Sequence, residues 1–128
     1  ASAPLPYVGE GSSEEAARLQ AEAVPLYEAL LAARARGDRQ AVAGLLAPGL
    51  GEEAADMLGQ QDRAKVLAMR ARVLACAGKD GKWEARVQFI GLLELDDGEP
   101  EPVEEVWQLV KVDGADGRWL IRAIDQVG

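Results

Sequence analysis

Histidine is missing from this chain of 128 residues, and cysteine occurs once, as Cys76. Without histidine, catalytic triads, imidazole acid–base chemistry and histidine-ligated metals are excluded. A single cysteine excludes an internal disulfide and a cysteine-built zinc site. We therefore expect no metal and no cofactor, and we expect Cys76 to be a small strand residue instead of a nucleophile, because no histidine is present to activate it.

Long apolar runs are also missing, because the stretch 41–50 is interrupted by Pro48 and Gly49. This argues against a membrane-spanning helix. The net charge of −8 argues against nucleic-acid binding through phosphate neutralisation. We expect a cytoplasmic or membrane-peripheral protein, with any membrane contact made peripherally or through an anchor outside this sequence.

The composition that remains, 48% hydrophobic and 28% charged, is typical of a globular protein with one core. Residues 1–11 are rich in Ala, Pro, Gly and Ser and predict a flexible arm or linker, so that 12–128 form a single domain. A helix is predicted from Ser12 to Gly37, with a kink or a break where Pro25 interrupts its apolar stripe. Asp38 is expected to cap a second helix through Leu46, and a third is predicted over 51–60.

From Lys65 onwards the apolar period changes from helical spacing to two, which predicts strands. They cover about 66–77, 83–95, 103–112 and 119–127, with Gly- and Asp-containing turns between them. The expected fold class is α+β, with N-terminal helices packed in the concave face of a curved four-stranded antiparallel sheet, a cone fold.

Alternation divides the predicted sheet into an inner face towards the helices and an outer face away from them. Aligning the strands about their turns places Ala71, Val73 and Ala75 beside Phe89, Val87 and Ala85. It also places Gly91 beside Trp107, and Glu105 between Leu93 and Asp125 on the inner face, whereas Cys76 falls on the outer face. A glycine that faces a tryptophan suggests a bend in the sheet.

This order of elements resembles the nuclear transport factor two-like and ketosteroid isomerase-like superfamily, a cystatin-like cone fold. Within it, GLLELDDGEPEPVEEVWQLVKVDGADGRWLIRAIDQ, residues 91–126, resembles the C-terminal signature of the Tim-forty-four-like domain. LYEALLAARARGDRQAVAGLLAPGL, residues 26–50, is similar to that family's long helix, Gly-Asp break and short helix. The resemblance implies a bacterial or mitochondrial adaptor of a translocation-type scaffold and carries across no catalytic residue.

Two features of the inner face suggest function. It could enclose an apolar pocket for a small molecule or lipid, although a filled core is the commoner outcome for aromatic residues at strand spacing. The residues predicted to line this pocket are Tyr27, Leu30, Phe89, Leu93, Trp107, Leu109, Trp119 and Ile121. Glu105 and Asp125 could instead be the paired carboxylates of a small cavity enzyme of the ketosteroid isomerase type, one of them acting as base. The alternative for this pair is two solvated strand-end carboxylates.

The outer face mixes arginine with apolar side chains, a composition typical of protein interfaces. We expect it to bind a protein partner or a second copy of the chain, and a covering arm is the third alternative. The predicted interface residues are Arg70, Arg72, Arg86, Ile90, Val106, Gln108, Val110, Leu120, Arg122 and Ile124. The sequence therefore favours a non-enzymatic binding or adaptor domain, with the cavity enzyme as the alternative.

Overall fold

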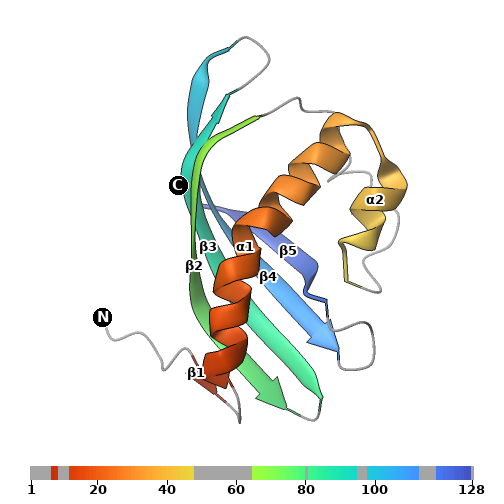
Figure 1. Ribbon diagram of the computed structural model, residues 1–128, viewed down its shortest axis with the longest axis vertical. Helices are drawn as coiled ribbons and strands as arrows, with labels where there is room; N and C mark the ends of the chain where they lie inside the picture. The colour runs from red at the N-terminus through yellow and green to blue at the C-terminus, as the bar shows by residue number, and fades with distance from the viewer. Residues whose placement is uncertain are drawn as a thin grey trace.

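A computed structural model of the protein describes residues 7–8, 12–47, 65–79, 81–94, 98–112 and 118–127. A long helix lies in the concave face of a curved sheet, and a short helix follows it (Figure 1). This confirms the predicted α+β cone fold. The elements are β1 (Tyr7–Val8), α1 (Ser12–Ala35), α2 (Arg39–Gly44), β2 (Lys65–Lys79), β3 (Lys82–Glu94), β4 (Pro100–Val112) and β5 (Leu120–Gln126).

The sheet has the strand order β1-β2-β3-β4-β5. Strands β2 to β5 form the predicted antiparallel meander. Strand β1 lies in the segment for which the sequence predicts an arm, and it pairs in parallel with Cys76 and Ala77 at the edge of β2. Strand β4 begins at Pro100 and includes Pro102, so it starts earlier than the predicted strand, which began at about residue 103.

Helix α1 contains Pro25 and continues through it as one helix of 24 residues. Of the two predicted outcomes, a kink or a break, the chain adopts the kink, and Figure 1 shows the helix changing direction between its red and orange halves. A bend of this kind separates the proline ring from the carbonyl four residues earlier, with which it would otherwise clash.

Helix α2 begins after Asp38, whose Oδ1 accepts a hydrogen bond from the N–H of Ala41 at 3.0 Å, so the predicted cap is confirmed. The helix ends at Gly44, before the predicted end at Leu46. Leu46 instead bridges to β5. There Ile121 donates its N–H to the carbonyl of Leu45 and accepts from the N–H of Ala47, both at 2.8 Å. The predicted third helix, 51–60, lies outside the described residues.

Strand β2 contains two bulges, one between Val66 and Ala68 and one between Val73 and Ala75. Ala71 and Val73 lie opposite Phe89 and Val87 as predicted. Beyond the second bulge, however, Cys76 instead of Ala75 lies opposite Ala85. The extra residue reverses the face of every later side chain. The prediction of Cys76 on the outer face is therefore wrong, and its side chain is fully buried in the core.

The pairing of β3 with β4 differs from the prediction by four residues. Trp107 lies opposite Val87, and Gly91 lies opposite Val103 and Met69. Because four is even, the side chains keep their predicted faces. Position 91 needs glycine because of a neighbour other than Trp107. A Cβ there would overlap the carbonyl oxygen of Ala68, beside the first β2 bulge.

A third bulge lies in β5, where Ile121 pairs with Leu109 but Ala123 pairs with Gln108. The residues after it therefore face the opposite way from the prediction. Ile124 lies opposite Trp107 on the inner face and packs against the core, and Asp125 lies opposite Val106 on the outer face. The predictions of Ile124 on the outer face and Asp125 on the inner face are both wrong.

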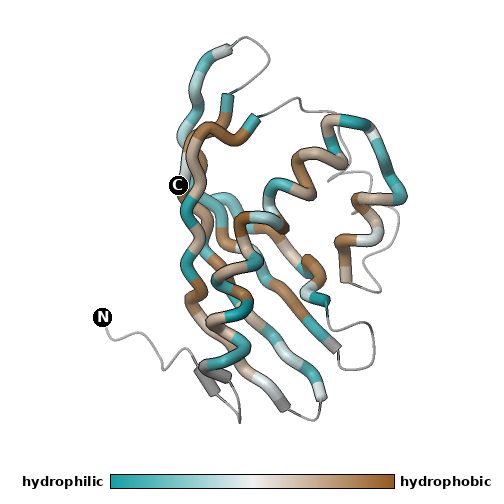
Figure 2. The backbone as a smooth tube through the Cα atoms, in the orientation of Figure 1, coloured by the Kyte–Doolittle hydropathy of each residue, from teal (hydrophilic) through white to brown (hydrophobic). Residues whose placement is uncertain are grey.

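The core lies between α1 and the inner face of the sheet, and α2 adds Val42 to it. Figure 2 shows apolar and polar residues alternating along the strands, as a sheet with one covered face requires. The largest fully buried side chains are Trp107, Tyr27, Phe89, Leu19, Leu30, Leu109 and Ile121.

Candidate functional site

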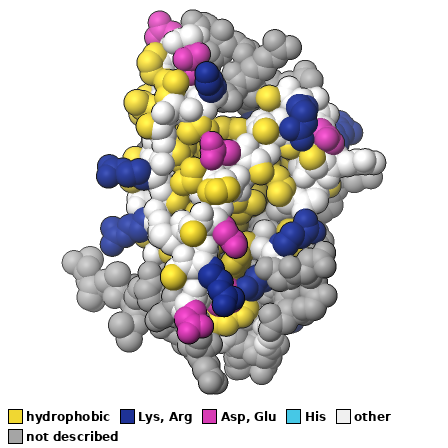
Figure 3. Space-filling model, viewed as in Figure 1, with side chains coloured by type: hydrophobic (Ala, Val, Ile, Leu, Met, Phe, Trp, Pro, Cys, Tyr) yellow, Lys and Arg dark blue, Asp and Glu magenta, His cyan; other side chains and the backbone are white. Residues whose placement is uncertain are grey.

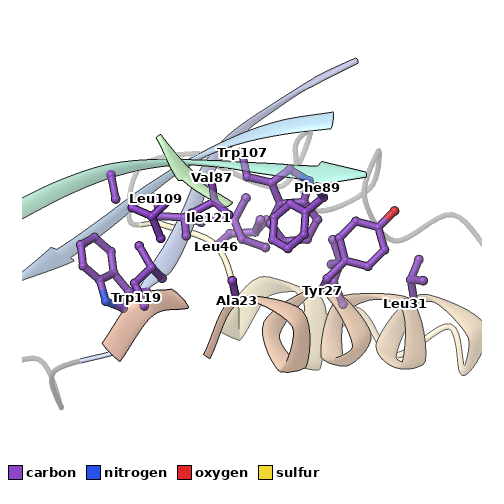
Figure 4. Close-up of a cluster of buried hydrophobic side chains, with 14 of the residues drawn as sticks. Ala23, Tyr27, Leu31, Leu46, Val87, Phe89, Trp107, Leu109, Trp119 and Ile121 are labelled. Atoms are coloured by element: carbon purple, nitrogen blue, oxygen red, sulfur yellow. The ribbon is translucent and has the colours of Figure 1, made fainter. Parts of the chain in front are cut away.

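The eight residues predicted to line an apolar pocket do come together on the inner face. All are at most 8% exposed. The rings of Tyr27, Phe89 and Trp107 pack against one another with centroids 4.7 to 5.0 Å apart, and Figure 4 shows them together at one end of the core with Trp119 at the other. These are the contacts of a packed core, in which aromatic pairs stabilise one another.

Glu105 lies beside this aromatic cluster and accepts hydrogen bonds from three elements. Trp107 Nε1 donates to its Oε1 at 2.9 Å, and Gln126 Nε2 donates to its Oε2 at 2.8 Å. The hydroxyl of Tyr27 on α1 also hydrogen-bonds to this carboxylate. Burial first, and then the charge and hydrogen bond of Glu105, raise the pKa of Tyr27 well above its usual range, while Arg34 lowers it in part.

The predicted carboxylate pair does not form, because the β5 bulge places Asp125 on the outer face. There its Oδ2 accepts from Gln108 Nε2 at 3.5 Å. Glu105 remains inside, but its oxygens already accept from Tyr27, Trp107 and Gln126. A carboxylate has about four lone-pair sites, so these three bonds occupy most of them. The contacts of Glu105 suit a residue that joins α1, β4 and β5.

A buried ion pair that the sequence analysis did not find lies at the start of α1. Lys111 Nζ contacts Glu15 Oε2 at 2.5 Å, with the two side chains 9% and 12% exposed. Lys111 also lies 5.4 Å from the centroid of the Trp119 ring, and Arg18 contacts the other oxygen of Glu15 at 3.3 Å. The sequence contained one sign of this pair: Lys111 is a charged residue at a strand position that faces the core.

Cys76 lies near this pair, on the same side of the sheet as α1. Burial raises the pKa of its thiol, the charge of Glu15 raises it further, and Lys111 lowers it in part. A buried thiol with a raised pKa stays protonated and is a poor nucleophile.

The outer face carries the predicted interface residues, apart from Ile124. Arg70 and Arg72 lie on β2, Arg86 and Ile90 on β3, and the others on β4 and β5, joined in register by the strand pairing. The arginines and Ile90 are exposed, whereas Val106, Gln108, Val110 and Leu120 are half-buried by their neighbours. The structure therefore brings these residues together on one surface.

Three polar contacts join strands across the outer face, two between neighbouring strands and one, from Arg122 to Glu84, between β5 and β3 across β4. Arg122 pairs with Glu84 at 3.2 Å, Gln88 donates to Glu104 at 3.0 Å, and Gln108 reaches Asp125. The other cations of this face behave differently. Within the described part of the chain, Arg70, Arg72 and Arg86 make no hydrogen bond or ion pair. Their guanidinium groups are available to a partner.

The outer face has two further features. Ile90, a predicted interface residue, is 45% exposed, and Leu92, which the sequence analysis missed, lies next to it on the same face of β3 and is 40% exposed; we call these two side chains the apolar end. Towards the other end of β3 is a depression of about 200 Å³, which we call the hollow. The hollow is lined by Ala75, Ala77, Glu84, Ala85, Arg86, Gln108, Leu109 and Arg122.

A second apolar surface is visible from the α1 side. Figure 3 shows apolar side chains gathered between the sheet and the second half of α1. Half-buried Val66, Met69 and Val103 pack against the core from β2 and β4. Because they continue the core outwards, this surface is the margin of the packed interior.

The same described residues also bear on metal and membrane sites. No group of three or more acidic or cysteine side chains there is arranged to hold a metal ion. No helix among them is long and apolar enough to cross a membrane.

Comparison with the models of known protein families gives no match to this chain, and comparison with curated proteins gives none either. Solved structures do match. A SEC-C motif containing protein from Rhodopseudomonas palustris is 19% identical, with 94% of this chain and 97% of that one covered and a TM-score of 0.51. A conserved protein from Planctomyces limnophilus is 14% identical, with 92% and 100% covered and the same TM-score.

A ketosteroid isomerase-like protein from Erwinia carotovora atroseptica is 16% identical, with 83% of this chain and 92% of that one covered and a TM-score of 0.49. At such identities the likeness concerns the fold alone. The chain has an α+β cone fold, which it shares with the two structures from Rhodopseudomonas palustris and Planctomyces limnophilus. Membership of the nuclear transport factor two-like and ketosteroid isomerase-like superfamily, and of the Tim-forty-four-like family within it, stays a prediction.

Proposed function

We propose that this protein is a non-enzymatic binding domain whose working surface is the outer face of its sheet. One observation carries the proposal. Ile90 and Leu92 lie exposed on β3, the central strand of the sheet, beside arginines that have no partner in the described part of the chain. Exposed apolar side chains at the centre of a sheet are costly in water unless a partner covers them.

The chemistry of this surface supports a protein as the partner. Arginine combines an apolar stem with a guanidinium that can make several hydrogen bonds, and it is enriched at protein interfaces. Arg70 and Arg72 alternate along β2 on the same side as Ile90 and Leu92. The resemblance to the Tim-forty-four-like domain supports an adaptor role in a translocation-type scaffold, with an apolar molecule or a membrane surface as further candidates for contact.

The test compares two single substitutions that introduce the same charge. Ile90→Glu places a carboxylate in the middle of the outer face, and Ala29→Glu places one on the exposed side of α1. Tagged forms of both and of the wild type are used to capture proteins from the source cells, including untagged copies of this chain. Circular dichroism establishes that each variant is folded.

We expect Ile90→Glu to lose proteins that the wild type and Ala29→Glu both retain. Each such protein is then purified, and its dissociation constant with Ile90→Glu should rise at least tenfold, because a carboxylate that must lose its water replaces an apolar contact. If Ile90→Glu binds every captured protein as tightly as Ala29→Glu does, the outer face is not the working surface.

A further inference from the structure

We infer that the hollow of the outer face receives the carboxyl end of a partner protein whose last residue is aliphatic. The inference rests on the proposed function, because it names the part of a protein partner that this surface binds. It comes from two observations at one place: an apolar floor of small side chains, and an arginine on the rim that has no partner within the described residues.

The hollow has the size and floor of a receptor for one side chain. Ala75 and Ala77 of β2 lie beside Arg86 and Glu84 of β3, and their methyl groups leave a space between the longer side chains. The volume of about 200 Å³ is smaller than the roughly 300 to 1,000 Å³ typical of small-molecule sites. A single aliphatic side chain therefore suits the hollow better than a metabolite.

The charges around the hollow leave one cation in excess. Arg122 reaches across β4 and pairs with Glu84 at 3.2 Å. Of the described residues that line the hollow, Glu84 alone is acidic, and Arg86 beside it makes no hydrogen bond or ion pair in that part of the chain. One carboxylate on the ligand balances these charges, and a guanidinium can hold a carboxylate through two parallel hydrogen bonds.

Among the residues of a protein, only the last one of a chain can carry both an aliphatic side chain and a carboxylate. An internal aspartate or glutamate would pair with Arg86 but leave the alanine floor in water, and an internal valine or leucine would fill the hollow but leave Arg86 unpaired. A terminal valine or leucine makes both contacts, which removes apolar surface from water and pairs the charge. Terminal carboxylates are among the groups by which domains recognise peptides.

The surrounding charges also favour one direction for the rest of the partner chain. Glu84 lies on one side of Arg86 along β3 and repels further carboxylates. On the other side are Gln88 and, next to it on β2, Arg72, which has no hydrogen bond or ion pair in the described part of the chain. Outward-facing residues of a strand are spaced by roughly 7 Å, which an extended partner spans in two residues. An acidic residue two positions before the end would therefore face Arg72, and the chain would continue over the apolar end.

The experiment titrates the protein with short acetylated peptides and follows its backbone amides by nuclear magnetic resonance. The first probe is Gly-Glu-Gly-Val with a free carboxyl end, and the matched probe is the same peptide with a terminal amide. At up to about 10 mM peptide, the free acid should shift the amide signals of Ala77, Arg86 and Gln108. The dissociation constant of the amidated peptide should be at least tenfold higher, because it lacks the charge that Arg86 binds.

Substitutions in the protein test each contact. Arg86→Gln removes the unpaired charge and Ala77→Leu fills the hollow without changing any charge, so each should raise the dissociation constant of the free acid at least tenfold. Arg39→Gln on the exposed side of α2 makes the same charge change elsewhere and should bind like the wild type. Arg72→Gln should weaken Gly-Glu-Gly-Val by about threefold and leave Gly-Gly-Gly-Val unchanged. Circular dichroism establishes that every variant is folded.

Three results overturn the inference. If the free and amidated peptides bind equally, or if neither shifts these amides, the hollow does not hold a terminal carboxylate. Isovalerate has the aliphatic group and the carboxylate without a peptide chain, and if it binds more tightly than the free peptide, a small acid occupies the hollow instead of a partner protein.

The peptide titration and the capture experiment report on different places, the hollow and the apolar end. If no peptide binds at the hollow while Ile90→Glu still loses captured proteins, the inference is wrong and the proposed function stands. If the free peptide binds as described while Ile90→Glu loses no protein, the terminal-carboxylate site stands and the proposed role of the wider outer face is wrong.

Discussion

At the scale of single residues, we expect loss of the buried contact between Lys111 and Glu15 to be especially destabilising. Both charges are nearly removed from water, and removal of an ion from water costs several kcal/mol. The short contact, the Trp119 ring and Arg18 offset that cost. Each charge therefore depends on the other to remain buried.

We expect Lys111→Met to lower the free energy of unfolding by about 3 kcal/mol, because it leaves Glu15 buried with only the exposed Arg18 as partner. The double variant Glu15→Leu/Lys111→Met should recover most of this loss, since apolar side chains of similar size replace the pair. Urea denaturation at neutral pH measures both.

The control for this prediction is Arg122→Met, which breaks the exposed pair with Glu84. Pairs in water contribute little, so the loss should stay below about 1 kcal/mol. Equal effects of Lys111→Met and Arg122→Met would mean that the buried pair makes no special contribution.

At the scale of elements, α1 protects the edge of the sheet. Gln20 on α1 donates from Nε2 to the carbonyl of Ala71, and its Oε1 accepts from the N–H of Val73 at 3.1 Å. These are the groups that an added strand would use, and β1 pairs only with Cys76 and Ala77 further along β2. The amide therefore takes the place of a neighbouring strand at an edge that could otherwise pair with another chain.

Replacing this amide should expose the edge. We expect Gln20→Leu to speed hydrogen exchange of the Val73 amide by roughly threefold to tenfold, because a hydrogen bond contributes about 0.5 to 1.5 kcal/mol. Gln40→Leu on the exposed side of α2 is the control, and its exchange at Val73 should match that of the wild type. Nuclear magnetic resonance measures both, and an unchanged Val73 rate in Gln20→Leu would show that another group protects this edge.

The elements also show which parts of the fold were predictable. The change of period at Lys65 correctly gave the strands, because alternation follows directly from burying one face. The bulge near Leu74 was hidden, since Ala75, Cys76 and Ala77 are all small and alternation cannot distinguish them. The bulge at Arg122 did leave a signal, because Ile121 and Ile124 are three residues apart and yet both face inwards.

Prediction of the site followed the same limits. Arg86 and Ile90 lie on β3, which has no bulge of its own, and Arg70 and Arg72 lie between the two β2 bulges, so their face was predicted correctly. Ile124 and Asp125 follow the β5 bulge and were assigned to the wrong faces. The Glu15–Lys111 pair joins residues 96 positions apart, and no local pattern reports such a contact. Residues of four strands line the hollow, so predicting it would have required the correct register of all four.

At the scale of the whole molecule, Tyr27 and Glu105 join the helical layer to the sheet. The hydroxyl of Tyr27 on α1 bonds to Glu105 on β4, which is also held by Gln126 on β5. The phenol can make this bond only while it keeps its proton. Folding of the two layers together is therefore coupled to the protonation of one tyrosine.

Burial and Glu105 hold the pKa of Tyr27 well above the value of about 10 found in an unfolded chain. Above about pH 10, the unfolded tyrosine has lost its proton while the folded one keeps it. The unfolded state then binds fewer protons, so this group makes the free energy of unfolding fall as pH rises, by up to about 1.4 kcal/mol per pH unit. Below about pH 10 its contribution is fully present.

Tyr27→Phe should therefore have two effects. At neutral pH it should lower the free energy of unfolding by about 1.5 to 3 kcal/mol, the usual contribution of a hydrogen bond to a charged group. Between about pH 9.5 and pH 11 the free energy of unfolding of the variant should fall less steeply with pH than that of the wild type, because the variant has no proton to lose at this position. Denaturant titration at each pH measures both.

The chain has two tyrosines, so Tyr7→Phe is the matched control and leaves Tyr27 as the sole source of tyrosinate absorbance. That absorbance should appear together with unfolding and not before it; tyrosinate that forms near pH 10 in the folded Tyr7→Phe protein would mean that Glu105 and burial do not hold the proton.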